Sequence, residues 1–428
     1  MAPVDPRAVE ALAELGCRDS EELAIGGIPV RDLARRFGTP LYAYDALVLR
    51  RRLAAVAGAL PEQVSLLYSV KANPSARIAR LLVSLGAGLE IASAGELCLA
   101  LAAGAEPGAI HFAGPGKTEA EIAFAIDRGP PCFHAESLEE IDRIRRLSGG
   151  RRVRVALRVH PERPMAGARM RMSGPSTRFG FEPRELPEAL AAARSSPSVE
   201  LVGLHVYGGT QVFDADSFSS LSAWLCGIAD RLESEGAPMR ELDLGGGFGV
   251  PTYVGDSVFD LSLAADSLRA LAAARPDRRY FVELGRYLAA PAGIYLASVV
   301  SRRESEGGFR AVLDGGLHQC ALAAGALSVL KRAPLCVHAT RLRADPVSVL
   351  VQGPLCTPAD SLPGPIEIPP PSVGDLLAIL NAGAYGLSFS PSAFLSHPRP
   401  AEVLVDGGEV HVLRPRGAFE DALLDQEA

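Results

Sequence analysis

Lys71 is the residue whose position first suggests chemistry. It follows the apolar run 66–70 (LLYSV) directly and precedes Ala72, Asn73 and Pro74, so its amine stands at the end of a predicted strand. A lysine amine in such a place can form a Schiff base with a carbonyl compound. A single lysine in a loop is more often a solvated charge, and the hypothesis therefore needs support from other residues.

A glycine run after the residues Leu-Asp-Leu is suited to phosphate binding. Gly245, Gly246 and Gly247 expose successive backbone N–H groups with little steric hindrance, and such groups can surround an anion. The spacing fits neither the dinucleotide-binding fingerprint nor the P-loop, and a tight turn is the simpler interpretation.

Two further pairs of residues follow or occupy predicted strands. Glu283 can keep a pyridine nitrogen protonated, and Arg286 can pair with a phosphate or a carboxylate. His205 and Tyr207 lie on one face of a strand, because side chains alternate along a strand, and both could face a flat ring. Taken alone, the first pair would be a surface ion pair and His205 a satisfied core residue.

The elements that must position these residues form a repeat. Short apolar segments alternate with Ala- and Leu-rich helical segments over residues 41–286, in about eight units. This pattern favours an α/β fold, a TIM-type (β/α)8 barrel, whose active site lies at the carboxyl ends of the strands. Beyond residue 286, shorter β-like runs separated by Gly and Pro predict a second domain, a β-sandwich or barrel-like structure.

We therefore assign residues 41–286 to the barrel, and residues 1–40 together with 287–428 to the β domain. The segment 22–30 (ELAIGGIPV) could pair with the C-terminal strands. Residues 161–175 predict a long loop of the kind that often covers a binding site.

Composition and charge argue against several classes of function. The net charge of −7 gives no general reason to bind nucleic acid or an anionic membrane. The N-terminus lacks the features of a signal peptide and no apolar run approaches ~20 residues, so we expect a cytoplasmic protein without a membrane span. The seven cysteines show neither a CxxC pair nor metal-type spacing, and we predict no metal site.

In their order, the motifs resemble the fold-type III decarboxylases that use pyridoxal 5′-phosphate (PLP), the family of diaminopimelate and ornithine decarboxylases. The matches cover nearly the whole chain, from YSVKAN (68–73) through ASAGEL, HFAGPGKT, STRFGF, GLHVYGGTQ, DLGGGFG, ELGR, LDGG, GPLCTPAD and GAYG to RPAEVLVDG (399–407). The resemblance implies PLP as the cofactor. It implies that Lys71 forms the Schiff base, that Glu283 pairs with the pyridine nitrogen, that Tyr207 stacks on the ring, and that Arg286 joins the phosphate or substrate site. The implied phosphate ligands are Gly245, Gly246, Gly247, Thr210 and Tyr385.

The resemblance also implies a shared active site. Cys356 is similar to the family's acid that returns a proton after CO2 leaves, and His205 joins it and Lys71 among the expected catalytic residues. Cys356 would act in the partner subunit of a head-to-tail homodimer, so that the β domain completes the partner's site.

Departures from the family pattern bear on the substrate. Diaminopimelate decarboxylases have Cys-Glu-Ser and ornithine decarboxylases Cys-Asp-Gly where this chain has Cys356, Thr357 and Pro358, so the acid that recognises a distal amino group is missing. Asp360 could be a partial substitute. The Arg-Pro-x-x-Tyr segment expected after LDGG is also missing.

These departures favour the branch of secondary metabolism or cell-envelope pathways. The substrate would then be an L-amino acid or an aminoacyl group, such as glutamyl, tethered to a carrier protein. Two alternatives remain: an amino-acid racemase, which shares the barrel and the PLP lysine, and a non-catalytic PLP-binding regulatory protein.

Overall fold

The computed structural model describes residues 5–162, 165–174, 179–305, 308–322 and 332–426. The chain divides into two compact units. The barrel unit comprises Arg52–Gly249 and Val258–Tyr287, and the β unit comprises Met1–Arg51, Val250–Ser257 and Leu288–Ala428. Among the described residues, no helix is both long and apolar enough to cross a membrane.

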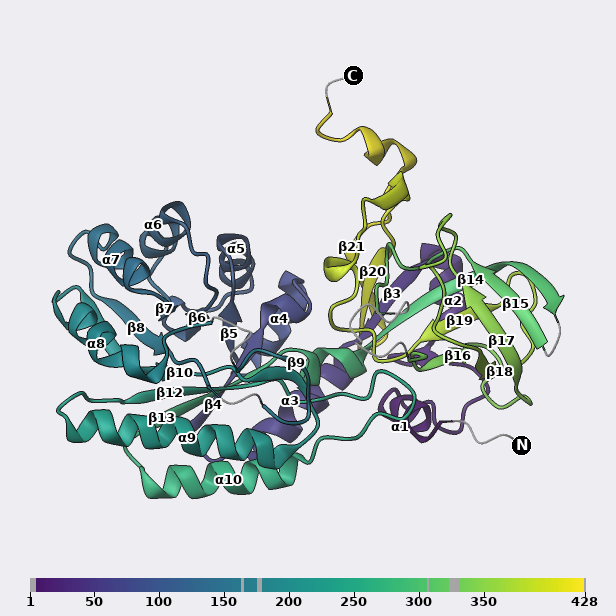
Figure 1. The fold of residues 1–428 in the computed structure, drawn as a ribbon. Coiled ribbons are helices and arrows are strands. Elements are labelled where there is room, and N and C mark those ends of the chain that lie inside the picture. The colour runs from purple at the N-terminus through teal and green to yellow at the C-terminus, as the bar shows by residue number, and fades with distance from the viewer. Residues whose placement is uncertain (1–4, 163–164, 175–178, 306–307, 323–331, 427–428) are drawn as a thin grey trace. The chain divides into compact units, whose positions relative to one another are not determined.

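The barrel unit is built on eight parallel strands that close on themselves (Figure 1). They follow one another around the barrel in chain order, and the last strand pairs with the first. The strands are β4 (Val64–Ser69), β5 (Gly88–Ile91), β6 (Ile110–Phe112), β7 (Cys132–Ala135), β8 (Val153–Arg158), β10 (Val199–His205), β12 (Glu241–Gly246) and β13 (Arg279–Leu284). The prediction of a TIM-type barrel is confirmed, and each of the eight apolar runs expected as strands supplies one of them.

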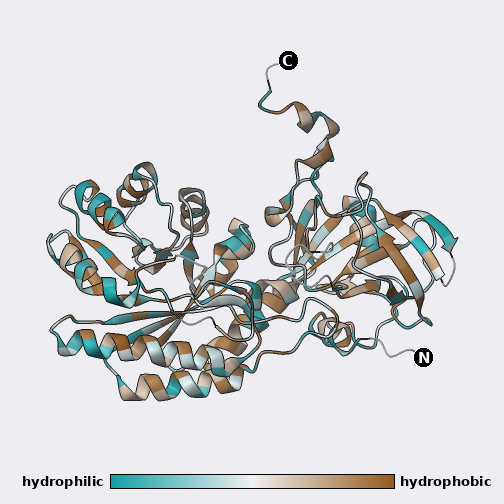
Figure 2. Ribbon diagram, viewed as in Figure 1, coloured by the Kyte–Doolittle hydropathy of each residue, from teal (hydrophilic) through white to brown (hydrophobic). Residues whose placement is uncertain are grey.

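Helices surround this barrel (Figure 1). They are α3 (Ala46–Ala59), α4 (Ala76–Ser84), α5 (Ala94–Ala102), α6 (Glu119–Asp127), α7 (Leu138–Leu147), α8 (Leu186–Arg194), α9 (Ala215–Ser234), α10 (Leu261–Ala274) and α11 (Arg286–Ala289). Most of them start at a polar cap whose side chain accepts a backbone N–H of the first turn, as Ser, Thr and Asp do at helix N-termini. The caps are Ser75, Ser93, Thr118, Ser137, Asp214 and Asp260. The long helices α9 and α10 carry both hydrophobic and hydrophilic residues (Figure 2).

The β unit is a mixed sheet that runs in the order β18-β17-β15-β14-β3-β20-β21, with β19 paired to β14 and β16 paired to β19. Its strands are β3 (Leu41–Asp45), β14 (Gly293–Ser305), β15 (Gly308–Leu313), β16 (Cys336–His338), β17 (Val347–Gln352), β18 (Ile366–Ile368), β19 (Leu376–Ile379), β20 (Ala401–Asp406) and β21 (Glu409–Arg414). Helices α1 (Pro6–Glu14) and α2 (Val30–Phe37) precede β3 in the chain.

Short 3-10 helices complete the described structure: η1 (Val70–Ala72), η2 (Pro107–Ala109), η3 (Pro183–Glu185), η4 (Ala290–Ala292), η5 (Leu387–Phe389), η6 (Phe394–Ser396) and η7 (Phe419–Leu423).

The structure corrects or refines three details of the sequence prediction. The barrel does not begin at residue 41, because β3 pairs antiparallel with β14 and parallel with β20, and its five residues are buried within that sheet. The segment 22–30 pairs with itself as β1 (Ala24–Ile25) and β2 (Ile28–Pro29), and the Leu23 N–H donates to the Ala339 carbonyl oxygen, directly after β16, at 2.8 Å. Residues 161–175 are not only loop, since β9 (Ala168–Arg171) pairs with β11 (Gly209–Val212), while residues 163–164 and 175 lie outside the described residues.

Candidate active site

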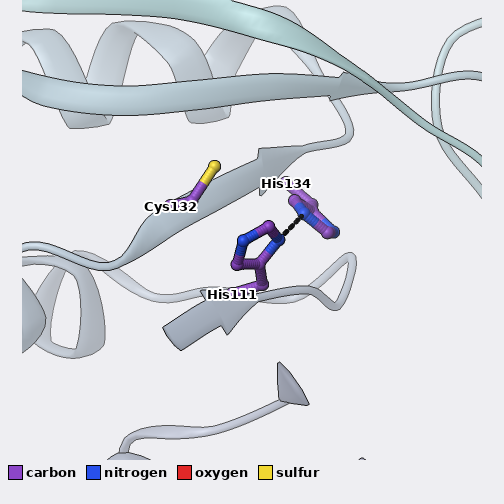
Figure 3. Close-up of side chains that lie close together, drawn as sticks. All are labelled: His111, Cys132 and His134. Atoms are coloured by element: carbon purple, nitrogen blue, oxygen red, sulfur yellow. Dashed lines mark hydrogen bonds between the residues drawn. The ribbon is translucent and has the colours of Figure 1, made fainter. Parts of the chain in front are cut away.

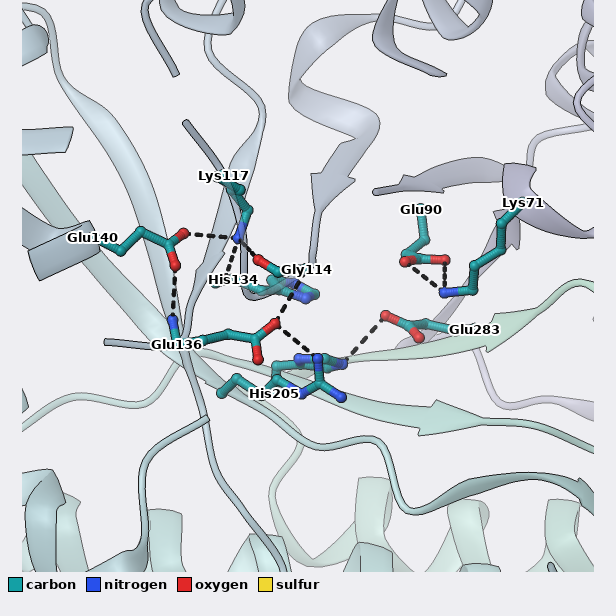
Figure 4. Close-up of polar contacts among 10 residues, drawn as sticks. Lys71, Glu90, Gly114, Lys117, His134, Glu136, Glu140, His205 and Glu283 are labelled. Carbon is teal, nitrogen blue, oxygen red and sulfur yellow. Dashed lines mark hydrogen bonds and ion pairs between the residues drawn. The ribbon is translucent and has the colours of Figure 1, made fainter. Parts of the chain in front are cut away.

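Lys71 lies in η1, immediately after strand β4, and its amine is held by a carboxylate from the next strand. The Lys71 Nζ lies 2.8 Å from both carboxylate oxygens of Glu90 (Figure 4). Glu90 is fully buried, whereas about a third of the Lys71 side chain is exposed. The lysine therefore combines a fixed amine with access from solvent, which a covalent attachment site requires. Nζ also lies 5.5 Å from the centre of the Tyr207 ring.

A second carboxylate, Glu283, lies near the end of β13. It is 2% exposed, and its Oε1 is 3.3 Å from Nε2 of His205 on β10 (Figure 4). Burial raises the pKa of the Glu283 carboxyl, and the positive charges of Lys71 and Arg158 oppose that shift. Burial also holds the pKa of His205 well below its usual value, so the imidazole is neutral and can donate one N–H to the carboxylate.

The glycine run at the end of β12 makes close contacts that exclude side chains. Gly245 and Gly247 have φ of +64° and +72°, where residues with a Cβ are strained. A Cβ on Gly247 would also lie 2.0 Å from the Gly209 carbonyl oxygen. The loop thus packs against β11, next to Thr210, and the Asp243 carboxylate accepts the Gly245 N–H at 3.0 Å. Tyr207 lies beside the same loop, since a Cβ on Gly245 would be 3.1 Å from its ring.

Arg286 begins α11, two residues after β13, and it is 6% exposed. Gly285 precedes it and lies against the Lys71 segment, because a Cβ there would be 2.7 Å from the Ala72 Cβ. The ends of β13 and β4 thus approach closely, as their parallel pairing requires. Most of the site residues expected from the sequence are therefore neighbours in one unit: Lys71, His205, Tyr207, Thr210, Gly245, Gly246, Gly247, Glu283 and Arg286.

The remaining predicted residues belong to the β unit. Cys356 is exposed on a loop, and Thr357 is part-exposed, with its Oγ1 accepting the Ala359 N–H at 3.3 Å. Tyr385 has a φ of +53° and its ring meets the Phe389 ring edge-on.

The Asp360 carboxylate is held by backbone groups of the β unit. Its side chain is 3% exposed, and its two carboxylate oxygens accept the backbone N–H groups of Leu317 at 2.6 Å and Leu355 at 2.8 Å. Its own carbonyl oxygen accepts the Gly353 N–H at 2.9 Å. That Asp360 contacts the substrate stays a prediction; in this structure the carboxylate holds the loop that presents Cys356.

Sequence reasoning missed several buried polar residues of the barrel. Glu90 holds Lys71 (Figure 4), and Arg158 forms a buried ion pair with Glu136 at 2.8 Å. The signal was present, because Glu90 is the single charge of β5, and Arg158 ends a strand, β8, whose other residues are apolar except Arg154. A charge at such a position is almost never buried without a partner, so each could have been flagged as a paired residue.

The chain is similar to known proteins both in sequence and in fold. A family model described as pyridoxal-dependent decarboxylase, pyridoxal binding domain, matches residues 47–290. An L-glutamyl-[BtrI acyl-carrier protein] decarboxylase of Niallia circulans is 34% identical over 406 residues, which cover 92% of this chain and 95% of that protein. The diaminopimelate decarboxylase of Aquifex aeolicus is 32% identical, with 93% and 94% of the two chains covered.

Solved structures agree in fold. The diaminopimelate decarboxylase of Helicobacter pylori in complex with L-lysine superposes with a TM-score of 0.85 at 27% identity, covering 92% of this chain and 98% of that chain. The diaminopimelate decarboxylase from m. jannaschii in co-complex with L-lysine superposes with a TM-score of 0.86 at 26% identity, covering 96% of this chain and 97% of that chain.

Proposed function

Because this chain belongs to the family of pyridoxal-dependent decarboxylases, we propose that it decarboxylates an L-glutamyl group carried by an acyl-carrier protein. PLP is its cofactor, and it is a decarboxylase of amino-acid or carrier-linked substrates, as its relatives are. Identity alone does not select the substrate, since relatives of both kinds are about equally similar. A carrier-linked substrate is therefore inferred from the residues of the Cys356 loop.

The observation that carries the proposal is the lack of an acid available in the Cys356 loop. Thr357 is neutral, and the two carboxylate oxygens of Asp360 accept the N–H of Leu355 in the loop and the N–H of Leu317 outside it. A free diamino acid brings a distal cation, which is expensive to bury without a carboxylate partner. A glutamyl group linked to a carrier has no such cation, so this loop suits it.

The residues of the barrel unit fit PLP. The Gly245–Gly247 loop leaves no room for side chains and can offer N–H groups to a phosphate, with Thr210 beside it. The buried Glu283 Oε1 has no hydrogen-bond partner among the described residues, and it suits a protonated pyridine nitrogen. When bound, PLP accepts into its conjugated ring the electrons that remain on Cα after CO2 departs.

The chain's own groups have separate tasks in this proposal. Lys71 binds the cofactor covalently, and Glu90 fixes its amine and can accept a proton from it. The neutral His205 lies beside Glu283, with its Nε2 3.3 Å from Oε1, and limits the positions that this carboxylate can take. Tyr207 supplies an aromatic face for stacking, and Arg286 and Tyr385 bind phosphate or substrate.

We also infer that the enzyme is a head-to-tail homodimer. In that assembly the β unit, residues 287–428 with the N-terminal segment, completes the site of the partner chain. Cys356 then donates a proton to Cα after CO2 has left, a general-acid role for which an exposed thiol is suited.

A substrate panel tests the proposal. CO2 release is measured from L-glutamyl acyl-carrier protein, free L-glutamate, diaminopimelate and L-ornithine, with the purified PLP-loaded enzyme. Release from the carrier-linked substrate alone is expected. Release only from diaminopimelate or ornithine would overturn the substrate assignment, and exchange of the Cα proton without CO2 would indicate a racemase.

A gain-of-function variant sharpens the test. Thr357→Glu restores an acid at a part-exposed position, and one charge-assisted hydrogen bond is worth about 1.5–3 kcal/mol, or roughly 10–150-fold in kcat/KM. We expect that gain for diaminopimelate and none for the glutamyl carrier, with Thr357→Ser as the control. No gain for diaminopimelate in a folded variant would contradict the role given to Thr357.

A further inference from the structure

Asp243 is a buried carboxyl residue that lies in β12, two positions before Gly245. The next strand of the barrel, β13, pairs with β12 and places Glu283 opposite Gly246. One carboxylate oxygen of Asp243 and one of Glu283 lie within 4.8 Å of each other, and each residue is only 2% exposed. The residue expected at the pyridine nitrogen therefore has a second carboxyl group as its neighbour.

Two carboxyl groups this close and this deeply buried hold a proton between them. In an interior without water two carboxylates repel each other, and one member of the pair stays protonated near neutral pH. An ionised carboxylate can only accept hydrogen bonds, so the side-chain hydrogen bond between Asp243 and Glu283 also requires a proton on one of them. One of the two residues is thus a neutral acid that donates to the other.

The surrounding charges make Asp243 the neutral member of the pair. Burial raises its pKa well above the usual value, and the negative charges of Glu283 and Glu90 raise it further. Burial raises the pKa of Glu283 as well, but the positive charges of Lys71 and Arg158 oppose that shift. Glu283 therefore keeps the negative charge, and this is the form that can hold a pyridine nitrogen protonated.

The two histidines beside Asp243 bind each other rather than its carboxyl group. Nδ1 of His111 and Nε2 of His134 lie 3.0 Å apart (Figure 3), whereas the Asp243 Oδ2 is 3.5 Å from the first nitrogen and 3.7 Å from the second. Burial lowers the pKa of His111 to about 3 and that of His134 well below its usual value, so both rings are neutral. Among the described residues, none donates a hydrogen bond to Oδ2. An oxygen without a donor suits the hydroxyl of a protonated acid, which is itself a donor.

The other oxygen of Asp243 binds the glycine run. Its Oδ1 accepts the Gly245 N–H at 3.0 Å, and Gly245 has a φ of +64°. We propose that Asp243 is a positioning residue for PLP, which as a neutral acid donates a hydrogen bond to the Glu283 carboxylate and accepts one from Gly245. One side chain thereby fixes the group at the pyridine nitrogen relative to the loop at the phosphate. The inference rests on the proposed pairing of Glu283 with that nitrogen.

Two replacements of Asp243 separate its hydrogen bonds from its charge. Asparagine has nearly the same shape, accepts through Oδ1 and donates through Nδ2, and carries no charge at any pH. Leucine fills a similar space and does neither. The PLP dissociation constant is measured by dialysis of the purified holoenzymes. A hydrogen bond to a charged group changes such a constant by roughly 10–150-fold, so Asp243→Leu should raise it by that factor, and Asp243→Asn by less than about threefold.

Nitrogen-15 NMR of holoenzyme with ring-labelled PLP reads the protonation of the pyridine nitrogen directly. Wild type and Asp243→Asn should show a protonated nitrogen at neutral pH. Asp243→Leu should show a shift toward the neutral form, because Glu283 without this donor is the stronger base and takes the proton. A role of Asp243 in stability alone would lower Tm without moving this signal. An unmoved signal in folded Asp243→Leu protein would therefore overturn the proposal.

The asparagine variant decides the proposal even if the leucine variant does not fold. Wild-type PLP binding and a wild-type nitrogen signal in Asp243→Asn support it. Loss of either would overturn it, since the negative charge of Asp243 rather than its hydrogen bonds would then be required. Glu283→Gln tests the underlying assignment separately. A nitrogen that stays protonated in Glu283→Gln would refute the pairing of Glu283 with the pyridine, whatever the Asp243 variants show.

Discussion

Replacing Asp360 by alanine should destabilise the β unit and slow the reaction without weakening substrate binding. The carboxylate accepts the buried N–H of Leu355 at 2.8 Å and the part-buried N–H of Leu317 at 2.6 Å. A buried donor left without a partner costs about 1–3 kcal/mol, and the part-buried donor costs less because water can replace its partner. We expect a loss of about 2–4 kcal/mol in the free energy of unfolding.

Calorimetry measures this loss. A domain of about 150–250 residues loses roughly 2–4 °C of Tm for each kcal/mol, so Tm of the β unit should fall by roughly 5–15 °C. The control is Asp345→Ala, since Asp345 is exposed in the same unit and its replacement should change stability by no more than about 0.5 kcal/mol.

Kinetics separate the two roles that Asp360 could have. Because the loop that Asp360 closes presents Cys356, the variant should lose kcat while KM stays near the wild-type value. A variant with unchanged Tm and a raised KM would refute this reasoning, since that pattern is the one expected if the carboxylate contacted the substrate.

Three further predictions concern Lys71, Cys356 and His318. Lys71→Ala should abolish the visible absorbance of lysine-bound PLP, and a variant that keeps it would refute the assignment of Lys71. Mixed dimers of Cys356→Ala and Lys71→Ala chains should recover part of the activity through one intact shared site; verified heterodimers with no recovery would count against the shared site. His318 is buried with its pKa lowered to about 4 by burial, so its contribution to stability is present above pH 6.5 and is lost as the pH falls toward 4. His318→Gln should flatten the fall in Tm over that range, and an equally steep fall would contradict the neutral, buried state.

The barrel could be predicted because its signals are local. Each βα unit combines a short apolar strand with a helix whose cap and apolar face lie next to it in the chain. The same local signal explains why the barrel was predicted to begin at residue 41. The apolar segment Leu41–Asp45 is followed by the helical residues of α3, and this is the pattern of a further βα unit. Only the pairing of β3 with β14 and β20, more than 200 residues away in the chain, shows that it belongs to the β unit.

The residues of the candidate site also divide into those that the local sequence identifies and those that depend on distant parts of the chain. Lys71 and Glu283 could be identified because each stands at the end of an apolar run, where the fold dictates that side chains gather. The direction of Asp360 could not be identified, because it depends on the Leu317 N–H, 43 positions away. Residue type thus determines which chemistry a side chain can perform, whereas its partners determine whether the group is available to perform it. For this chain the distinction underlies the proposed substrate, since the acid that is present in the Cys356 loop already accepts two backbone N–H groups and is less available to a distal cation.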